Sequence, residues 1–118
     1  MSGYYGLMCR YQDDQNFYYF AVANNGDYIM EKYVNAEFQP LFSEGWRRSD
    51  AIYQGNHTNR LEADCSGTTL SFYVNNVLLD EVTDTDFTAG LTGVIVGARD
   101  DQGFEVVFTN FVITKPSQ

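Results

Sequence analysis

The residues best suited to bind a ligand are aromatic and basic, and they centre on the only tryptophan of the chain. Trp46 is followed directly by Arg47 and Arg48, in a sequence with only seven basic residues. Aromatic rings offer flat apolar faces to the C–H groups of a sugar ring, and arginine donates hydrogen bonds to hydroxyl oxygens. Tyrosines on neighbouring strands are expected to join this site. The candidate ligand-binding residues are Trp46, Arg47, Arg48, Tyr33, Tyr53 and Tyr73.

The same residues also have a purely structural interpretation, and the sequence leaves it open. Tyrosines commonly fill half-buried strand positions with their hydroxyls at the surface. The two arginines can equally serve to neutralise nearby acids. Exposure of Trp46 would favour the binding interpretation.

The acidic residues do not indicate catalysis, although there are sixteen of them. Hydrolysis of a glycosidic bond needs two carboxylates about 5–10 Å apart. Close acidic pairs fall in predicted turns, where carboxylates usually accept hydrogen bonds from backbone N–H groups. Glu31 and Glu105 lie on predicted strands, where either could face a cleft, but one carboxylate does not make an acid/base pair. The acidic pairs are Asp13/Asp14, Asp84/Asp86 and Asp100/Asp101.

Histidine and cysteine are equally sparse. The single histidine, His57, lies in a polar loop, and the two cysteines are too few for a structural zinc site or a disulfide scaffold. We therefore assign no catalytic residue, no metal ligand and no cofactor.

Length and charge exclude further classes of function. A chain of 118 residues is predicted to form one domain. Seven basic against sixteen acidic residues give a net charge of −9, which repels phosphate backbones and anionic membrane surfaces. No apolar run approaches the roughly 20 residues that cross a membrane. We expect no nucleic-acid partner and no membrane insertion, and no secretory signal is recognised in the chain.

Alternation of apolar and polar residues recurs along almost the whole chain, broken by turn residues every eight to twelve positions. It predicts eight or nine antiparallel strands and no helix, hence an all-β sandwich or jelly roll formed by residues 1–118. In the first strand Tyr5, Leu7, Cys9 and Tyr11 are predicted to share one face. The predicted strands after it are 17–23, 28–34, 38–42, 60–65, 70–74, 77–79, 91–98 and 104–113.

Two details of the pattern predict local structure. Residues 17–23 are apolar on both faces, as a central strand requires. Residues 24–27 read Asn-Asn-Gly-Asp, the strongest hairpin signal of the chain, and we expect a type I′ turn there. The stretch 43–58, which holds Trp46, is the longest without regular alternation.

Three hairpin segments resemble one known superfamily. The first is Gly6-Leu7-Met8-Cys9-Arg10-Tyr11 followed by Asn16-Phe17-Tyr18-Tyr19-Phe20. The second is Asn59-Arg60-Leu61 with Gly67-Thr68-Thr69-Leu70 and Tyr73-Val74-Asn75, and Asn76 stands where that hairpin usually has a turn glycine. The third is Gly93-Val94-Ile95 with Phe108-Thr109-Asn110-Phe111. Together they are similar to concanavalin A-like lectin/glucanase jelly rolls, and specifically to bacterial laminin G-like and 3-keto-disaccharide hydrolase-like domains.

The resemblance carries several expectations. The superfamily places the strands of Cys9 and Cys65 in one sheet region, so these residues either form a disulfide or pack as two buried free thiols. A structural calcium ion, with Asp100 and Asp101 as oxygen donors, is left open only as an alternative to the assignment of no cofactor, because Thr109 and Asn110 replace the carboxylate of the closing motif. The acidic catalytic cluster of the superfamily's retaining glucanases is missing from this sequence.

The resemblance also implies strands before the first segment, one of which pairs with the last strand. Because this chain begins almost at that segment, we expect a domain that lacks its N-terminal strands. Residues 104–113 would then form an unpaired sheet edge open to a second copy or a partner strand.

Three functions are compatible with these observations. The first is a non-catalytic module that binds carbohydrate or a cell surface, as part of a larger extracellular bacterial protein. The second is a structural module that forms a homodimer or accepts a partner strand through its terminal strand. The third, a glycoside hydrolase-like enzyme, is the least favoured because no pair of carboxylates is placed for it.

Overall fold

The computed structural model describes residues 3–42, 45–55 and 57–98 of the chain, and within them nine strands and no helix. The strands pair antiparallel throughout, which confirms the all-β prediction. None of the described residues forms a helix able to cross a membrane. The strands are β1 (Gly3–Asp13), β2 (Asn16–Ala23), β3 (Asp27–Val34), β4 (Glu37–Pro40), β5 (Arg47–Arg48), β6 (Leu61–Ser66), β7 (Thr69–Val74), β8 (Val77–Thr83) and β9 (Leu91–Ala98).

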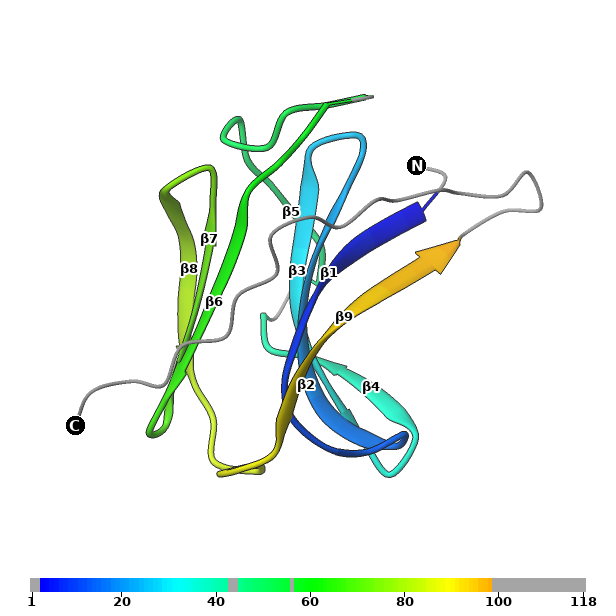
Figure 1. Cartoon of the computed structure of the whole chain (residues 1–118), viewed down its shortest axis with the longest axis vertical. Helices are drawn as coiled ribbons and strands as arrows, with labels where there is room; N and C mark the ends of the chain where they lie inside the picture. The colour runs from blue at the N-terminus through cyan, green and yellow to red at the C-terminus, as the bar shows by residue number, and fades with distance from the viewer. Residues whose placement is uncertain (1–2, 43–44, 56, 99–118) are drawn as a thin grey trace.

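These strands form two sheets that face each other as the layers of a sandwich (Figure 1). The larger sheet, sheet A, has the order β4-β3-β2-β1-β9, with the two-residue β5 paired to the beginning of β3. The smaller sheet, sheet B, has the order β6-β7-β8. Most predicted strands are therefore present. The fourth ends at Pro40 instead of 42, and the strand predicted at 77–79 extends to Thr83.

Strand β2 is central in sheet A and is buried on both faces, as its apolar sequence predicts. Side chains alternate across a strand, so Tyr18, Phe20 and Val22 point into the sandwich while Phe17, Tyr19 and Ala21 point away from it. The first set packs in one core with residues of sheet B, and the second belongs to a separate cluster on the other side of sheet A. The core between the sheets consists mainly of Cys9, Tyr18, Phe20, Val22, Tyr28, Met30, Phe42, Ile52, Leu70, Phe72, Val74 and Phe87.

A β-bulge in β1 overturns the prediction that Tyr11 lies on the same face as Cys9. The register of β1 against β2 shifts between Cys9 and Asp13, and Arg10 has a φ of 51°. The extra residue reverses the alternation, so Tyr11 packs on the outer side of sheet A against Phe17, with 5.5 Å between ring centroids. Gly90 lies against this bulge, where a Cβ atom would come within 2.5 Å of the Arg10 carbonyl carbon.

The turn at 24–27 joins β2 and β3, but it is not the predicted type I′ turn. Asn24 and Asn25 have negative φ, and only Gly26 is left-handed, at 94°. The Gly26 N–H donates to the Ala23 carbonyl, which gives an ordinary turn followed by a left-handed glycine. Positive φ at both central residues, as type I′ requires, occurs instead in the loops Asn35-Ala36 and Asn75-Asn76.

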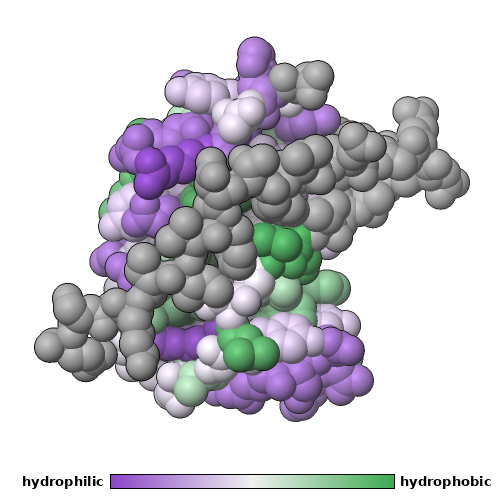
Figure 2. Space-filling view, viewed as in Figure 1, coloured by the Kyte–Doolittle hydropathy of each residue, from purple (hydrophilic) through white to green (hydrophobic). Residues whose placement is uncertain are grey.

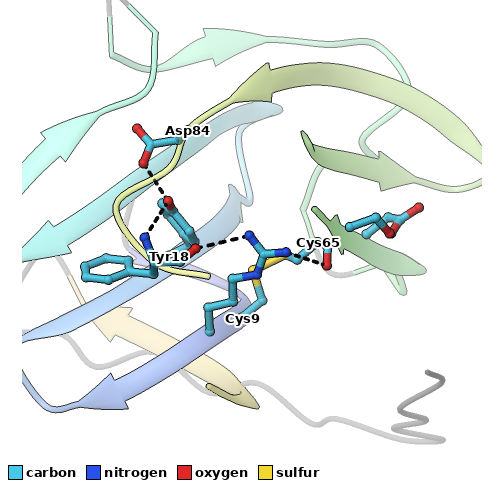
Figure 3. The surroundings of a disulfide bond; sticks show 8 residues. Cys9, Tyr18, Cys65 and Asp84 are labelled. Atoms are coloured by element: carbon cyan, nitrogen blue, oxygen red, sulfur yellow. Dashed lines mark hydrogen bonds between the residues drawn. A yellow bond between two sulfur atoms is a disulfide. The ribbon is translucent and has the colours of Figure 1, made fainter. Parts of the chain in front are cut away.

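The two sheets are linked covalently where the bulge meets β6 (Figure 3). Cys9 and Cys65 are joined in a disulfide with 6.7 Å between their Cα atoms. The buried Arg10 guanidinium lies beside it and donates one hydrogen bond to the Phe87 carbonyl and one to the Cys65 carbonyl, both at 3.1 Å. This arrangement attaches β1 both to β6 and to the loop before β9.

Strand β9 is one edge of sheet A among the described strands, and β4 is at the other end of the sheet. Leu91 is 71% exposed and Val94 is 36% exposed, and Figure 2 shows hydrophobic surface on this side of the molecule between hydrophilic regions. The predicted strand 104–113, and with it the expected unpaired edge, lies outside the described residues.

We expect Ala36→Gly to stabilise the protein. Ala36 has a φ of 68°, a conformation that costs an L-residue with a Cβ about 1–2 kcal/mol and that glycine adopts freely. Part of the gain is offset by the greater entropy of glycine in the unfolded chain, so the net effect is about 1 kcal/mol, or roughly 3–5 °C in Tm. Differential scanning calorimetry measures it. Ala89→Gly, at an exposed loop residue without positive φ, is the control and should not raise Tm.

The disulfide should account for a large part of the stability. Cys9 and Cys65 are 56 positions apart, and closing a loop of that length stabilises the native state by about 4 kcal/mol in the chain-entropy treatment. The double variant Cys9→Ala, Cys65→Ala should therefore unfold at a clearly lower urea concentration than the oxidised wild type. Mass spectrometry of the unreduced protein showing two free thiols would contradict the bond itself.

Candidate functional site

The side of sheet A turned away from sheet B carries a continuous group of aromatic side chains, which we call the outer aromatic face. Alternation along four neighbouring strands places them there, and the residue before β5 adds Trp46. The register sets Tyr33 directly between Phe17 and Phe38. The outer aromatic face consists of Tyr4, Tyr11, Phe17, Tyr19, Tyr33, Phe38 and Trp46.

The rings of this face contact one another from one end to the other. Centroid separations are 4.3 Å for Tyr33 and Phe38, 5.9 Å for Phe38 and Tyr19, 6.4 Å for Tyr19 and Tyr4, and 5.9 Å for Tyr4 and Trp46. Such edge and offset contacts fix the rings relative to the sheet. Phe38 is 55% exposed, and Tyr4, Tyr33 and Trp46 are partly exposed. The face is therefore a rigid apolar surface that solvent still reaches.

One carboxylate, that of Glu31, lies within the aromatic face. Glu31 is opposite Tyr19 on one side and Pro40 on the other, and only 9% of it is exposed. Burial raises the pKa of its carboxyl group above the usual value. Among the described residues, no side chain forms an ion pair or hydrogen bond with it. Every fully enclosed side-chain oxygen of the described residues has a hydrogen-bond partner, so the oxygens of Glu31 are not fully enclosed. The carboxylate of Glu31 is thus largely desolvated, uncompensated, and still in contact with the surface.

Of the six residues predicted to bind ligand, the structure brings Trp46 and Tyr33 together on the outer aromatic face. Arg48 lies at one end of it, exposed, where its guanidinium pairs with Asp27 at 3.5 Å. This pairing fits the interpretation in which an arginine neutralises a nearby acid.

Arg47 points to the other side, toward sheet B. Its guanidinium lies 4.0 Å from the centroid of the Phe42 ring and pairs with Asp80 of β8 at 2.5 Å. The Tyr28 hydroxyl donates to the same carboxylate at 2.9 Å, and burial together with Asp80 raises the pKa of Tyr28 to about 12. Arg47 and Tyr28 therefore join the two sheets at one edge.

Tyr53 and Tyr73 lie away from this face. Tyr53 is 53% exposed and lines a shallow open depression with Ile52, Gln54 and His57. Tyr73 follows the buried Phe72 on β7 and points to the outer side of sheet B. The six predicted residues thus do not form one site.

The acids of the described turns have structural roles. Asp13 accepts hydrogen bonds from the Gln15 N–H and the Asn16 side chain. Burial alone would raise the pKa of Asp84, but hydrogen bonds from Lys32 and Tyr18 hold it below its usual value. The Lys32 ammonium lies 2.7 Å from both Asp84 and Asp86.

No three His, Cys, Asp or Glu side chains in the described part of the chain come together as a metal site. The expected calcium donors Asp100 and Asp101, the accompanying Thr109 and Asn110, and Glu105 all lie outside the described residues.

Sequence reasoning missed Tyr4, Tyr19, Phe38 and the burial of Glu31 within the same face. The signal was present in part, because a two-residue loop at Asn35-Ala36 fixes the register that sets Phe38 opposite Tyr33. Alternation of residue types does not distinguish a partly exposed outer face of a sheet from a second buried core.

Comparison with known proteins supports the fold. No family model and no curated protein matches the chain. Among solved structures, the chain is similar to the carbohydrate-binding module CBM66 from Bacillus subtilis, with a TM-score of 0.62 and 19% identity over 81% of this chain. The match covers 55% of that module, so the chain spans about half its length. This similarity shows a β-sandwich of the kind found in that module.

Replacing the desolvated carboxylate should stabilise the protein at neutral pH. The pKa of Glu31 is higher in the folded than in the unfolded state, so folding is favoured below the usual pKa of 4.5 and loses that contribution as pH rises through the raised value. We expect Glu31→Gln to melt at a higher temperature than the wild type at pH 7, with the difference disappearing below pH 4.5. A lower Tm at pH 7 in calorimetric scans would show that the carboxylate is compensated.

Proposed function

We propose that this chain is a non-catalytic carbohydrate-binding module, and that it binds its ligand through the outer aromatic face. The observation that carries the proposal is the unbroken row of rings from Phe38 to Trp46, in which every ring except the buried Tyr19 is at least partly exposed. Similarity to a carbohydrate-binding module, and the resemblance to concanavalin A-like lectin domains, support the same class of function.

The physical basis is a surface of aromatic rings that the sheet holds in place. Sugar rings have apolar C–H faces that stack on aromatic rings, and the partly exposed Tyr33 carries a hydroxyl that can exchange hydrogen bonds with the sugar hydroxyl groups. Neighbouring strands are about 4.8 Å apart, so rings on adjacent strands can contact consecutive parts of one saccharide. Because the sheet holds the rings in place, binding loses little side-chain entropy.

A hydrolase function is not favoured by this face. The other carboxylate of β3 at this face, Asp27, lies four residues before Glu31, which corresponds to about 13 Å along the strand. That separation exceeds the distance at which two carboxylates cleave a glycosidic bond. Asp27 also pairs with Arg48.

The setting of the module is part of the proposal. A disulfide between Cys9 and Cys65 is typical of oxidising compartments, which favours an extracellular or cell-surface protein of which this chain is one module. The net charge of −9 disfavours a nucleic-acid ligand, so the proposed partner is a glycan.

A second candidate function is assembly through a sheet edge. The exposed Leu91 and Val94 on the edge strand β9 favour it, although the predicted terminal strand 104–113 lies outside the described residues. Sedimentation equilibrium distinguishes the two, because a homodimer doubles the mass with no glycan present.

Two aromatic residues of equal exposure test the position of the binding site. Phe38→Ala should reduce affinity for any retained polysaccharide by roughly tenfold or more, because it removes an exposed ring from the row. Tyr53→Ala, at a ring exposed to the same extent, should leave affinity unchanged. Affinity gel electrophoresis against a panel of soluble polysaccharides measures both.

The opposite outcome would be equally informative. Loss of binding in Tyr53→Ala alone would move the site to the depression beside His57. A wild-type protein retarded by no polysaccharide, soluble or insoluble, would remove support for the function itself.

A further inference from the structure

We propose that Glu31 selects the ligand of the outer aromatic face, and that this ligand is a saccharide with free amino groups, such as an oligomer of unacetylated glucosamine. The inference rests on the proposed function and adds to it a chemical class of ligand. It is carried by the position of the Glu31 carboxylate between aromatic rings and by its lack of a cation.

Glu31 occupies the middle of β3, between two aromatic walls. The first wall is Trp46, which packs against the cluster that contains Ile29, two residues before Glu31. The second wall is Tyr33, two residues after Glu31, together with Phe38, which contacts Tyr33. Each wall is about 7 Å from Glu31 along the strand. A saccharide lying along β3 would therefore meet rings on both sides of one carboxylate.

No cationic side chain of the described residues forms an ion pair with the Glu31 carboxylate. Arg48, the cation at the end of the face, pairs with Asp27. Lys32, next to Glu31 in sequence, points to the opposite side of the sheet and pairs with Asp84 and Asp86. Tyr11 donates to Asp14 at the far end of the face. Among the described residues no cation pairs with the Glu31 carboxylate, and in this proposal the ligand supplies the compensating charge.

An ammonium group is the ligand chemistry that fits best. A hydrogen bond between two charged groups is about twice as strong as one between neutral groups, so an ammonium compensates the carboxylate better than a hydroxyl. Aromatic rings attract a cation to their faces, and along β3 the rings of Tyr33 and Phe38 lie on one side of Glu31 and that of Trp46 on the other. Acidic sugars and phosphates would be repelled by Glu31 and by the net charge of −9.

Isothermal titration calorimetry with two chemically matched ligands tests the inference. At about pH 6, free amines are mostly protonated, and an ammonium group bound beside Glu31 favours the ionised form of its carboxyl group. The wild type should bind the hexamer of glucosamine at least tenfold more tightly than the hexamer of N-acetylglucosamine, which has the same rings without the charge. In Glu31→Gln this preference should fall to less than threefold.

Two controls make the result specific. Glu62→Gln, at an exposed residue of sheet B, changes the net charge equally and should keep the full preference. Glu31→Gln is expected to be more stable than the wild type, so a loss of preference cannot be ascribed to unfolding. Phe38→Ala should weaken binding of both hexamers.

The outcomes separate the inference from the proposed function. Binding of neutral saccharides by the wild type, with no preference for the amine and no change in Glu31→Gln, would overturn the inference and leave the proposed function standing. Absence of binding to any saccharide would overturn both. An equal loss of preference in Glu62→Gln would show that net charge, rather than Glu31, attracts the amine.

Discussion

The burial of β2 on both faces is the constraint on which the rest of the structure depends. Phe20 and Val22 enter the core between the sheets, and this requires sheet B as a cover. Phe17 and Tyr19 point the other way, where no second sheet lies among the described strands, and rings from β1, β3, β4 and the residue before β5 cover them. The outer aromatic face thus exists because a central strand must be covered twice, and its second cover is thin enough to remain partly exposed.

The bulge in β1 connects the two sides of sheet A. Cys9 and Arg10 both reach toward sheet B, where they form the disulfide and the hydrogen bonds to Phe87 and Cys65. The inserted residue also turns Tyr11 to the outer side, where it stacks on Phe17. One irregularity therefore connects the two sheets and extends the aromatic face.

The periodicity of the sequence predicted the strands and the burial of β2, which depend on alternation alone. It predicted little of the bulge and the turns, where the alternation is broken. Strands such as Leu91–Ala98 and the burial of β2 follow directly from residue types. The bulge at Arg10 does not, because one additional residue leaves the apolar pattern on each side intact. The turn type at Gly26 depends on which asparagine takes a positive φ, and Ala36 shows that even alanine is forced into it. Trp46 lies near Tyr33 only because β5 pairs with β3. This pairing could not be predicted, because β5 has only two residues and lies in a stretch with no periodic signal.

The environments of the acids distinguish structure from function more clearly than their number does. Asp80 and Asp84 lie at the edges between the sheets, and each accepts hydrogen bonds from a cation and a tyrosine. Glu31 lies on the outer side of sheet A. Among the described residues, neither a cation nor a tyrosine hydroxyl forms a hydrogen bond with its carboxylate. A desolvated carboxylate without compensation lowers stability, and local violations of the rules for a stable fold are concentrated where a protein binds or reacts. The acid that stabilises the fold least is for this reason the one most informative about the ligand.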